Sequence, residues 1–410
     1  MTEYIIGPFT QLLPMSNLPS KGAIQDNQLE VLTEAAIHVK DGIIKAVAPF
    51  ERLTKELNHL PVKELETNFI GLPGFIDCHT HICFAGSRAR DFAWRIAGKT
   101  YLEIAKEGGG IWDTVTSTRA ADSNNLLVDL EARANLLLKR GVTTIEVKSG
   151  YGLDVENELK MLRVIKMANE RLDADLISTC LAAHIVPREF KDRPKEYLEL
   201  VINELLPQIK SENLSSRIDA FIEEEAYTAD NILPYLDAAK KMGMDITLHA
   251  DQFSPGGSEL GVRCGAISVD HLEASGHNEI EMLAKSDVVS VVLPGASIGL
   301  GCDFAPSRAI LDAGGTVAIA SDWNPGSAPM GDLFTQASIM ATFQKMSNAE
   351  VLSGLTSRAA KALNLTDRGT LESQKLADII LFEESDYREL LYRQGRLVPK
   401  VIVKNGKIIE

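Results

Sequence analysis

Eight short apolar stretches alternate with amphipathic helical stretches through the middle of the chain, and this alternation restricts the possible folds more than any other feature. Apolar residues three and four positions apart fill most of the intervals, for example residues 125–141 and 156–172. Alternating strands and helices form parallel sheets, and eight units predict a closed (β/α)₈ barrel. A doubly wound open sheet explains the number of units less well. The predicted strands cover residues 74–81, 143–150, 178–184, 218–226, 245–251, 266–272, 288–294 and 316–322.

Both ends of the chain carry a hairpin pattern. Asp41-Gly42 and Asn405-Gly406 each lie between alternating apolar and polar residues, and both dipeptides favour type I′ turns. We therefore expect a small β-sandwich domain built from both termini, beside the barrel. The expected division is residues 1–70 for the first part of the small domain, 71–360 for the barrel and 361–410 for the second part.

Composition narrows the class of partner. The formal net charge of the 410 residues is −15, which argues against nucleic acid and anionic membranes as partners. The five cysteines form no C-x-x-C pair, as is usual in a reducing cytoplasm. We find no signal peptide and no run of about 20 apolar residues. We therefore expect a cytoplasmic protein that acts on small molecules.

Five of the eight histidines fall at the ends of predicted strands, and Asp322 ends the last one. The C-terminal ends of barrel strands face one another across the mouth of the barrel, so these side chains are expected to converge. One such histidine alone would more simply be a satisfied polar residue. Several together, with a carboxylate, favour a site for zinc or iron that activates water. The five are His79, His81, His184, His249 and His271.

Several motifs support a resemblance to a known family. PGFIDCHTH, LHAD, VDHLE and SDWNPG resemble the metal-dependent amidohydrolase superfamily. FAGSRARDF, YLEIAKEGGGI, GVTTIEVKSGYGL and NPGSAP make the chain similar to the imidazolonepropionase family within it, from about Gly71 to Pro329. The resemblance implies hydrolysis of the lactam amide of 4-imidazolone-5-propanoate to N-formimino-L-glutamate, in histidine degradation. It also implies one metal ion, Zn²⁺ or Fe³⁺, and a homodimer.

The same resemblance assigns roles to individual residues. The implied metal ligands are His79, His81, His249 and Asp322. The implied substrate-binding residues are Arg88, Tyr101, Tyr151, His184, Gln252, Asn324, Gly326 and Ser327. The implied catalytic residues are Asp322, His271, His184 and Gln252.

Elementary chemistry agrees with these roles. Arg88 suits the propionate, because a guanidinium binds a carboxylate in two places; the simpler alternative is a surface arginine paired with Asp91. The turn at residues 324–327 is expected to offer backbone N–H groups to an anion; the alternative is a plain β-turn with no ligand. Asp322 is expected to move the proton, His271 to steady the oxyanion and His184 to polarise the carbonyl.

Two residues help to separate the alternatives. Gln252 stands where many related enzymes have glutamate, and an amide cannot shuttle protons, which counts against a guanine- or cytosine-type deaminase. Lys148 lies outside the fourth predicted strand, where two-metal relatives carry a bridging lysine, so one metal is expected. A non-catalytic scaffold on the same fold would have broken ligand positions, and none is broken here.

Overall fold

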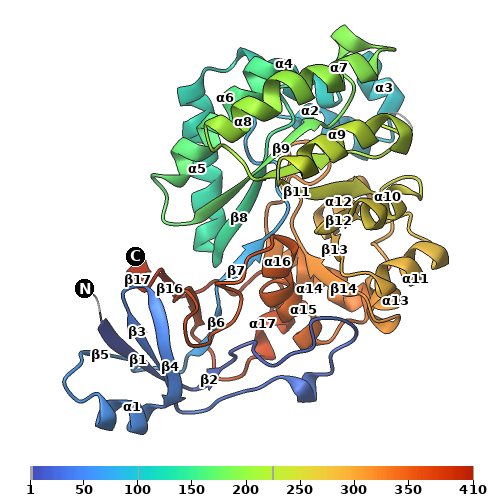
Figure 1. Cartoon of the computed structure of the whole chain (residues 1–410). Coiled ribbons are helices and arrows are strands. Elements are labelled where there is room, and N and C mark those ends of the chain that lie inside the picture. Colours follow the sequence, from blue (N-terminus) through green and yellow to red (C-terminus); the bar gives the residue numbers. More distant parts are fainter. Residues whose placement is uncertain (1–2, 100, 224–225, 410) are drawn as a thin grey trace.

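The chain folds into a parallel barrel beside a smaller β-sandwich (Figure 1). The computed structural model describes residues 3–99, 101–223 and 226–409, and the side chains of residues 101, 102 and 105 lie outside the described part. Within these ranges no helix is both long and apolar enough to cross a membrane.

The barrel contains eight parallel strands that pair in the order of the sequence. Its first and last strands meet through a bridge between Thr80 and Trp323, and the Asp322 N–H donates to His79 O at 3.0 Å. The predicted (β/α)₈ barrel is therefore confirmed. Its strands are β7 (Phe75–Asp77), β8 (Val142–Lys148), β9 (Asp175–Ala183), β10 (Arg217–Ala220), β11 (Asp245–Ala250), β12 (Ser268–His271), β13 (Val289–Val292) and β14 (Thr316–Ile319).

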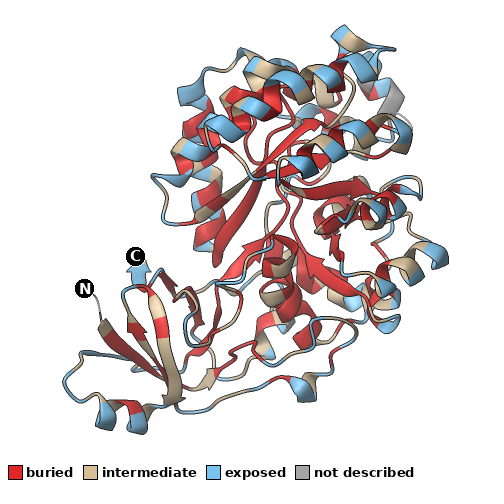
Figure 2. Cartoon of the chain, viewed as in Figure 1, coloured by how far each residue is buried: buried red, intermediate tan, exposed pale blue. Residues whose placement is uncertain are grey.

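Helices surround these strands, with their buried faces inward and their exposed faces toward solvent (Figure 2). Two of the long ones begin at aspartates whose side chains accept a backbone N–H, Asp122 from Asn125 and Asp154 from Asn157, as N-caps do. The helices between β8 and β14 are α6 (Val155–Asn169), α7 (Pro194–Leu200), α8 (Leu206–Ser211), α9 (Ala229–Lys241), α10 (Gly257–Cys264), α11 (His277–Lys285), α12 (Pro294–Leu300) and α13 (Ser307–Asp312), with one π-helical turn at Val201–Leu205 and one 3₁₀ turn at Arg188–Phe190.

Two groups of helices add to the simple alternation. Between β7 and α5 (Ser123–Lys139) the chain forms α2 (Ala89–Ile96), α3 (Tyr101–Lys106) and α4 (Ile111–Ala120). These three follow the end of β7, so they lie on the side of the barrel where the histidines are. After β14 come α14 (Leu333–Gln344), α15 (Asn348–Gly354) and α16 (Ser357–Ala362), of which α15 and α16 pack on β14.

The sandwich joins the two ends of the chain, which lie near each other (Figure 1). Asp41, Gly42, Asn405 and Gly406 all have φ between 49° and 80°, which confirms the type I′ turns. The two hairpins lie in different sheets that share one apolar core. One sheet has the order β4 (Ile43–Pro49), β3 (Ala35–Lys40), β1 (Glu3–Phe9), β5 (Val62–Glu64); the other has β17 (Lys407–Ile409), β16 (Val401–Lys404), β15 (Ile379–Phe382), β6 (Ile70–Pro73), β2 (Gln11–Leu12).

Strand β6 leads directly from the sandwich into the first barrel strand. It pairs with β15 in the second sheet, and β7 begins two residues after it ends. The expected boundary between residues 70 and 71 therefore falls inside a strand, and the domain limits remain a prediction. The remaining helices are α1 (Phe50–Glu56), α17 (Glu389–Tyr392) and a 3₁₀ turn at Asp26–Gln28.

Candidate metal centre and catalytic cavity

Four predicted ligands converge at the C-terminal end of the barrel. His79 and His81 follow β7, His249 lies in β11, and Asp322 follows β14. His81 Nε2 lies 3.2 Å from both His79 Nε2 and His249 Nε2. Asp322 Oδ1 lies 3.6 Å from His79 Nε2 and 3.4 Å from His81 Nε2. All four side chains are buried.

The second nitrogens of two of these rings face carboxylates. His79 Nδ1 is 2.6 Å from Asp270 Oδ2, and His249 Nδ1 is 2.9 Å from Asp219 Oδ2. The His79 Nδ1–H donates a hydrogen bond to Asp270, which leaves His79 Nε2 with a lone pair, whereas His249 Nδ1 only lies close to the charge of Asp219. Burial lowers the pKa of His249 to about 4, so its ring stays neutral.

The arrangement fits one bound cation. Lone pairs of neutral imidazoles that face each other repel unless a proton or a cation lies between them, and one proton cannot serve three rings. Tetrahedral coordination with Zn–N distances of about 2.0–2.1 Å places neighbouring ligand atoms about 3.3–3.4 Å apart. The separations around His81 Nε2 lie close to that value. Histidine nitrogens with one carboxylate oxygen suit zinc and iron alike.

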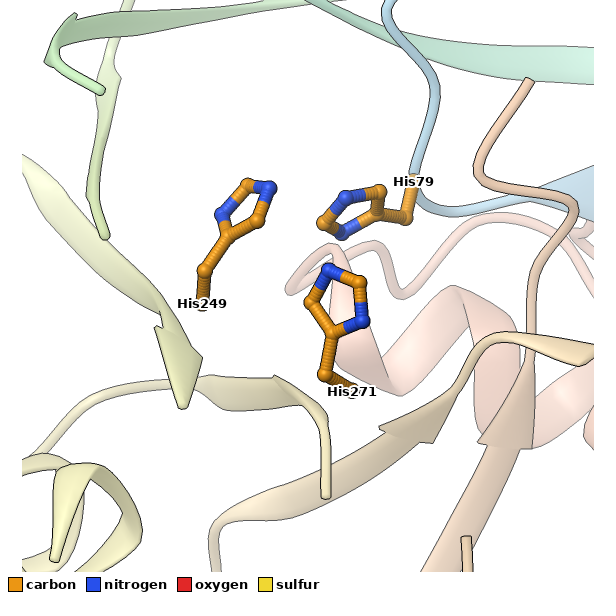
Figure 3. A group of neighbouring side chains, drawn as sticks. All are labelled: His79, His249 and His271. Atoms are coloured by element: carbon orange, nitrogen blue, oxygen red, sulfur yellow. The ribbon is translucent and has the colours of Figure 1, made fainter. Parts of the chain in front are cut away.

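His271 lies beside this group from β12. The rings of His79, His249 and His271 point toward one another (Figure 3), and their ligand atoms form a second candidate group within 4.8 Å. Burial opposes a charge on His271, but Glu273, with Oε2 3.4 Å from Nδ1, raises its pKa. The family resemblance places His271 beside the proposed metal ligands rather than among them.

A buried ion network supports the ligands from inside the barrel. Lys148 Nζ lies 2.9 Å from Asp219 and 3.9 Å from Asp270. The same two carboxylates face the Nδ1 atoms of His249 and His79. Burial opposes the charge of Lys148, yet the surrounding carboxylates raise its pKa, so it remains a cation. Lys148 therefore holds both carboxylates in position.

A third carboxylate fixes the backbone between the first two histidines. Glu146 accepts a hydrogen bond from Lys148 at 2.8 Å and from the Thr80 N–H at 3.2 Å. The Thr80 hydroxyl also donates to Glu146 O at 2.6 Å. The H-x-H segment is thus tied to β8 at its central residue, although β7 itself ends at Asp77.

Two of the functional residues have a strained backbone. His271 has φ 87° and Asp322 has φ 53°, both in the left-handed region that non-glycine residues rarely adopt. Each such residue costs about 1–3 kcal/mol, and strain of this kind collects at functional sites. Here it lets the chain leave the strand while the side chain still points toward the histidine cluster.

A cavity of about 270 Å³ is lined by three of the four predicted metal ligands, His81, His249 and Asp322. All of the predicted substrate-binding residues with described side chains line it; Tyr101 lies outside the described part. The lining residues from that prediction are Arg88, Tyr151, His184, Gln252, Asn324, Gly326 and Ser327.

The structure corrects the expectation for the turn at residues 324–327. The N–H groups of Gly326 and Ser327 already donate to Asn324 Oδ1, at 2.8 and 2.7 Å. They are therefore not available to an anion in this conformation. Asn324 shapes the turn, and the donors for an anion have to come from side chains.

The structure also corrects the role expected for His184. Its Nδ1 lies 3.0 Å from Gly150 O, and a carbonyl can only accept, so the proton is on Nδ1. Burial and the nearby His249 lower the pKa of His184 to about 3, so the ring is neutral. Its Nε2 is then an acceptor, suited to an N–H group of a substrate ring and unable to polarise a carbonyl.

Tyr151 takes its place from a turn that a buried carboxylate holds. Glu158, in α6, accepts hydrogen bonds from the N–H groups of Gly150, Gly152 and Leu153 at 3.1, 2.8 and 2.8 Å. Burial raises the pKa of the Tyr151 phenol, so its hydroxyl remains a donor.

Several of these supporting residues were not recognised in the sequence. They are Asp219, Asp270, Glu146 and Glu158, and Arg95, which lines the cavity, was not recognised either. The available indication was a charged residue inside an apolar strand, as in VDH and IDA. A buried charge of this kind needs a partner and so points to a network.

Comparison with known proteins agrees with the fold and the site. The model of the amidohydrolase family matches residues 70–409. The imidazolonepropionase of Shewanella sp. (strain MR-4) is 42% identical over 382 residues, covering 92% of this chain and 93% of the relative. That of Geobacillus sp. (strain WCH70) is 37% identical over 417 residues, covering 100% and 98%.

Solved structures share the fold. A triazine hydrolase variant superposes with a TM-score of 0.72 at 16% identity, covering 99% of this chain and 94% of that one. An adenosine deaminase from Xanthomonas campestris, crystallised with zinc, superposes with a TM-score of 0.69 at 18% identity, covering 99% and 92%.

Barrel, cavity and family match together define a hydrolase of the amidohydrolase class. The full-length similarity is more specific than the shared fold, because it extends over the sandwich as well as the barrel. The chain belongs to the imidazolonepropionase family.

Proposed function

We propose that the chain hydrolyses the lactam amide of 4-imidazolone-5-propanoate and releases N-formimino-L-glutamate, as a step of histidine degradation. The observation that carries the proposal is that Arg88 lines the same cavity as the histidine cluster. A substrate with a hydrolysable ring and an acidic side chain matches both features of that cavity.

The proposed ligands for one metal ion are His79, His81, His249 and Asp322, and His81 Nε2 lies 3.2–3.4 Å from a ligand atom of each of the other three. When bound, such an ion supplies Lewis-acid chemistry that brings the pKa of a water molecule toward 7. Histidine and aspartate do not separate zinc from iron, so the metal content of the purified protein decides between them.

The cavity residues orient the substrate ring. The propionate extends toward Arg88, and the neutral His184 accepts an N–H of the ring through Nε2. The Tyr151 hydroxyl donates from the turn held by Glu158. Gln252 lines the same cavity and hydrogen-bonds the ring without exchanging a proton.

Proton transfer is assigned to two side chains at the strand ends. Burial raises the pKa of Asp322 to about 6, which makes it a better base than an exposed carboxylate. Asp322 takes the proton from the attacking water and returns it to the ring nitrogen as the C–N bond breaks. Glu273 raises the pKa of His271, which favours the charged ring, and His271 donates to the carbonyl oxygen as negative charge develops there.

A guanine- or cytosine-type deaminase is less well supported. Those substrates are neutral bases without a carboxylate, and they leave Arg88 without a purpose. An amide at position 252 cannot carry a proton to an amino leaving group.

The test is hydrolysis of freshly prepared 4-imidazolone-5-propanoate, followed as loss of ultraviolet absorbance, with metal content measured on the same sample. Guanine and cytosine are assayed in parallel. Turnover of the imidazolone alone, abolished in His249→Ala together with the bound metal, supports the proposal. Full metal content without turnover of the imidazolone rejects the substrate.

We also propose a cytoplasmic location and a homodimer. All five cysteines are free, and three of them are buried, as expected in a reducing compartment. Light scattering of the purified protein tests the dimer, and a monomer mass at micromolar concentration would reject it.

A further inference from the structure

The cavity is lined by more cationic side chains than a single substrate carboxylate needs for its binding. Arg88, Arg95 and Lys99 all line it, in a protein whose net charge is −15. Asp91 is the acidic residue that lines the same region. The three cations differ in the partners that they already have.

Arg88 and Lys99 are each neutralised by a carboxylate. Arg88 Nε donates to Asp91 Oδ2 at 2.5 Å, and Asp91 is 2% exposed. Lys99 Nζ lies 2.6 Å and 2.7 Å from the two oxygens of Glu107. Neither side chain therefore adds an uncompensated charge to the cavity.

Arg95 has no carboxylate partner among the residues that the structure describes. Its Nη2 donates to Gly326 O at 3.2 Å, and its Nε is buried without a hydrogen-bond acceptor in the described part. A guanidinium with an unused, buried donor that faces a cavity is suited to an anion.

Arg88 and Arg95 both approach Gly326. A methyl group placed on Gly326 would lie 3.4 Å from Arg88 Nη1, and the carbonyl of Gly326 accepts from Arg95. The N–H groups of Gly326 and Ser327 are occupied by Asn324, so guanidinium groups are the donors that remain here. The two guanidinium groups carry two positive charges and the one carboxylate, Asp91, neutralises one of them, so a net positive charge remains beside Gly326.

We propose that Arg95 is a specificity-determining residue that binds the substrate carboxylate together with Arg88. The inference rests on the proposed function for the identity of that carboxylate. Asp91 accepts the hydrogen bond from Arg88 Nε, so the Nη atoms of Arg88 remain to donate to the substrate. Arg95, whose charge Asp91 does not neutralise, supplies the net positive charge. A carboxylate with hydrogen bonds from two guanidiniums is bound in a fixed orientation.

The experiment compares Arg95→Gln and Arg95→Lys with Arg90→Gln. Arg90 lies on the same helix, α2, but is 52% exposed, pairs with Asp113 at 3.3 Å and does not line the cavity. We expect Arg95→Gln to raise KM about tenfold to a hundredfold, with kcat within about twofold, because the carboxylate lies away from the reacting carbonyl. The KM of Arg95→Lys should lie between those of the wild type and Arg95→Gln, since lysine keeps the positive charge but lacks the paired N–H donors of the guanidinium. Arg90→Gln should match the wild type.

A neutral substrate separates binding from a structural role. The propionamide analogue of the substrate has no carboxylate, so Arg95→Gln and the wild type should hydrolyse it with equal kcat/KM. If Arg95 only holds the turn through Gly326 O, the acid and the amide lose activity by the same factor. That result, or an unchanged KM for the acid, overturns the proposal.

Binding of imidazole-4-propanoate, which has the side chain but no hydrolysable carbonyl, is measured by calorimetry on the same variants. It keeps the inference testable if the wild type does not turn over the imidazolone, in which case the proposed function fails first. Weaker binding in Arg95→Gln, about tenfold or more, with wild-type affinity in Arg90→Gln, supports the carboxylate site independently of catalysis. Equal affinity in all variants rejects it.

Discussion

His79 Nδ1 and Asp270 Oδ2 lie 2.6 Å apart, so a hydrogen bond inside the barrel joins the end of its first strand to its sixth. Asp270 also accepts from Ser268 Oγ at 2.7 Å, which fixes its own orientation. The carboxylate sets the tautomer of His79 and increases the basicity of Nε2. We therefore expect Asp270 to contribute to metal affinity without being a ligand itself.

Asp270→Asn tests this contribution. The amide is uncharged and holds the His79 Nδ1 proton less strongly, so we expect metal affinity to fall about 10–100-fold. Competition with a chromogenic chelator measures the affinity. Asp237→Asn, on the exposed face of α9, is the control and should keep the wild-type value. An Asp270→Asn protein with wild-type affinity would show that the hydrogen bond does not affect the metal.

Lys148→Met removes the cation at the centre of the buried network. Glu146 and Asp219, at 2.8 and 2.9 Å, would then be buried anions without compensation. Breaking one side of a buried ion network costs about 3–5 kcal/mol. We expect that decrease in the free energy of unfolding, measured by urea denaturation.

A second substitution separates charge from packing in this case. In Lys148→Met/Glu146→Gln one uncompensated anion is gone, so part of the lost stability should return. A double variant as unstable as Lys148→Met, or less stable, would mean that shape and hydrogen bonds, rather than charge balance, determine the cost.

The barrel and its histidines could be predicted because they depend on local patterns. His249 and His271 end apolar strands in consecutive units, and parallel pairing sets His249 opposite Asp270 and Ala250 opposite His271. Once the fold is a barrel, strand ends must converge. Periodicity and topology together therefore predict that these side chains converge, whereas the choice of His79, His81, His249 and Asp322 as metal ligands comes from the family resemblance and remains a prediction.

The supporting contacts could not be predicted, because they depend on which side chains meet across the barrel. Lys148 and Asp219 are 71 positions apart in the sequence, and nothing local to either one indicates the other. Hydrogen-bond direction is equally hidden. The expected role of His184 was wrong because Gly150 O, on a different strand's loop, fixes its proton on Nδ1. The expectation that the turn at Asn324 offers free N–H groups was wrong for the same reason, because the Asn324 side chain accepts them.

Glu158→Gln tests how the Tyr151 turn is held. Glutamine keeps one oxygen for Gly152 and Leu153, but its amide group would face the Gly150 N–H as a second donor. Gly150 then shifts, and its carbonyl is the partner of His184. We expect kcat/KM for the imidazolone to fall about tenfold, which corresponds to the net free energy of one hydrogen bond, while metal content is unchanged.

Glu156→Gln is the matched control, because Glu156 lies two residues earlier on α6 and is exposed. It should keep wild-type kcat/KM. Loss of metal from Glu158→Gln would contradict the prediction, since it would place the effect on the metal centre and not on the turn.

Tyr4→Phe tests the link between the two termini. The Tyr4 hydroxyl in β1 donates to Gly406 O in the C-terminal hairpin at 2.8 Å. Burial raises the pKa of Tyr4 from 10.0 to about 12. Between these values the native state holds a proton that the unfolded chain has lost, so stability falls as pH rises from 10 to 12. Partial solvent access reduces the effect to about 1 kcal/mol. We expect Tyr4→Phe to be less stable than the wild type at pH 8 by about 1 kcal/mol, the net value of one hydrogen bond. Between pH 8 and pH 11, however, the free energy of unfolding, measured by urea denaturation, should fall less in Tyr4→Phe than in the wild type. Equal losses in both proteins would show that Tyr4 does not titrate in this range and that the two termini are held together by their shared apolar core alone.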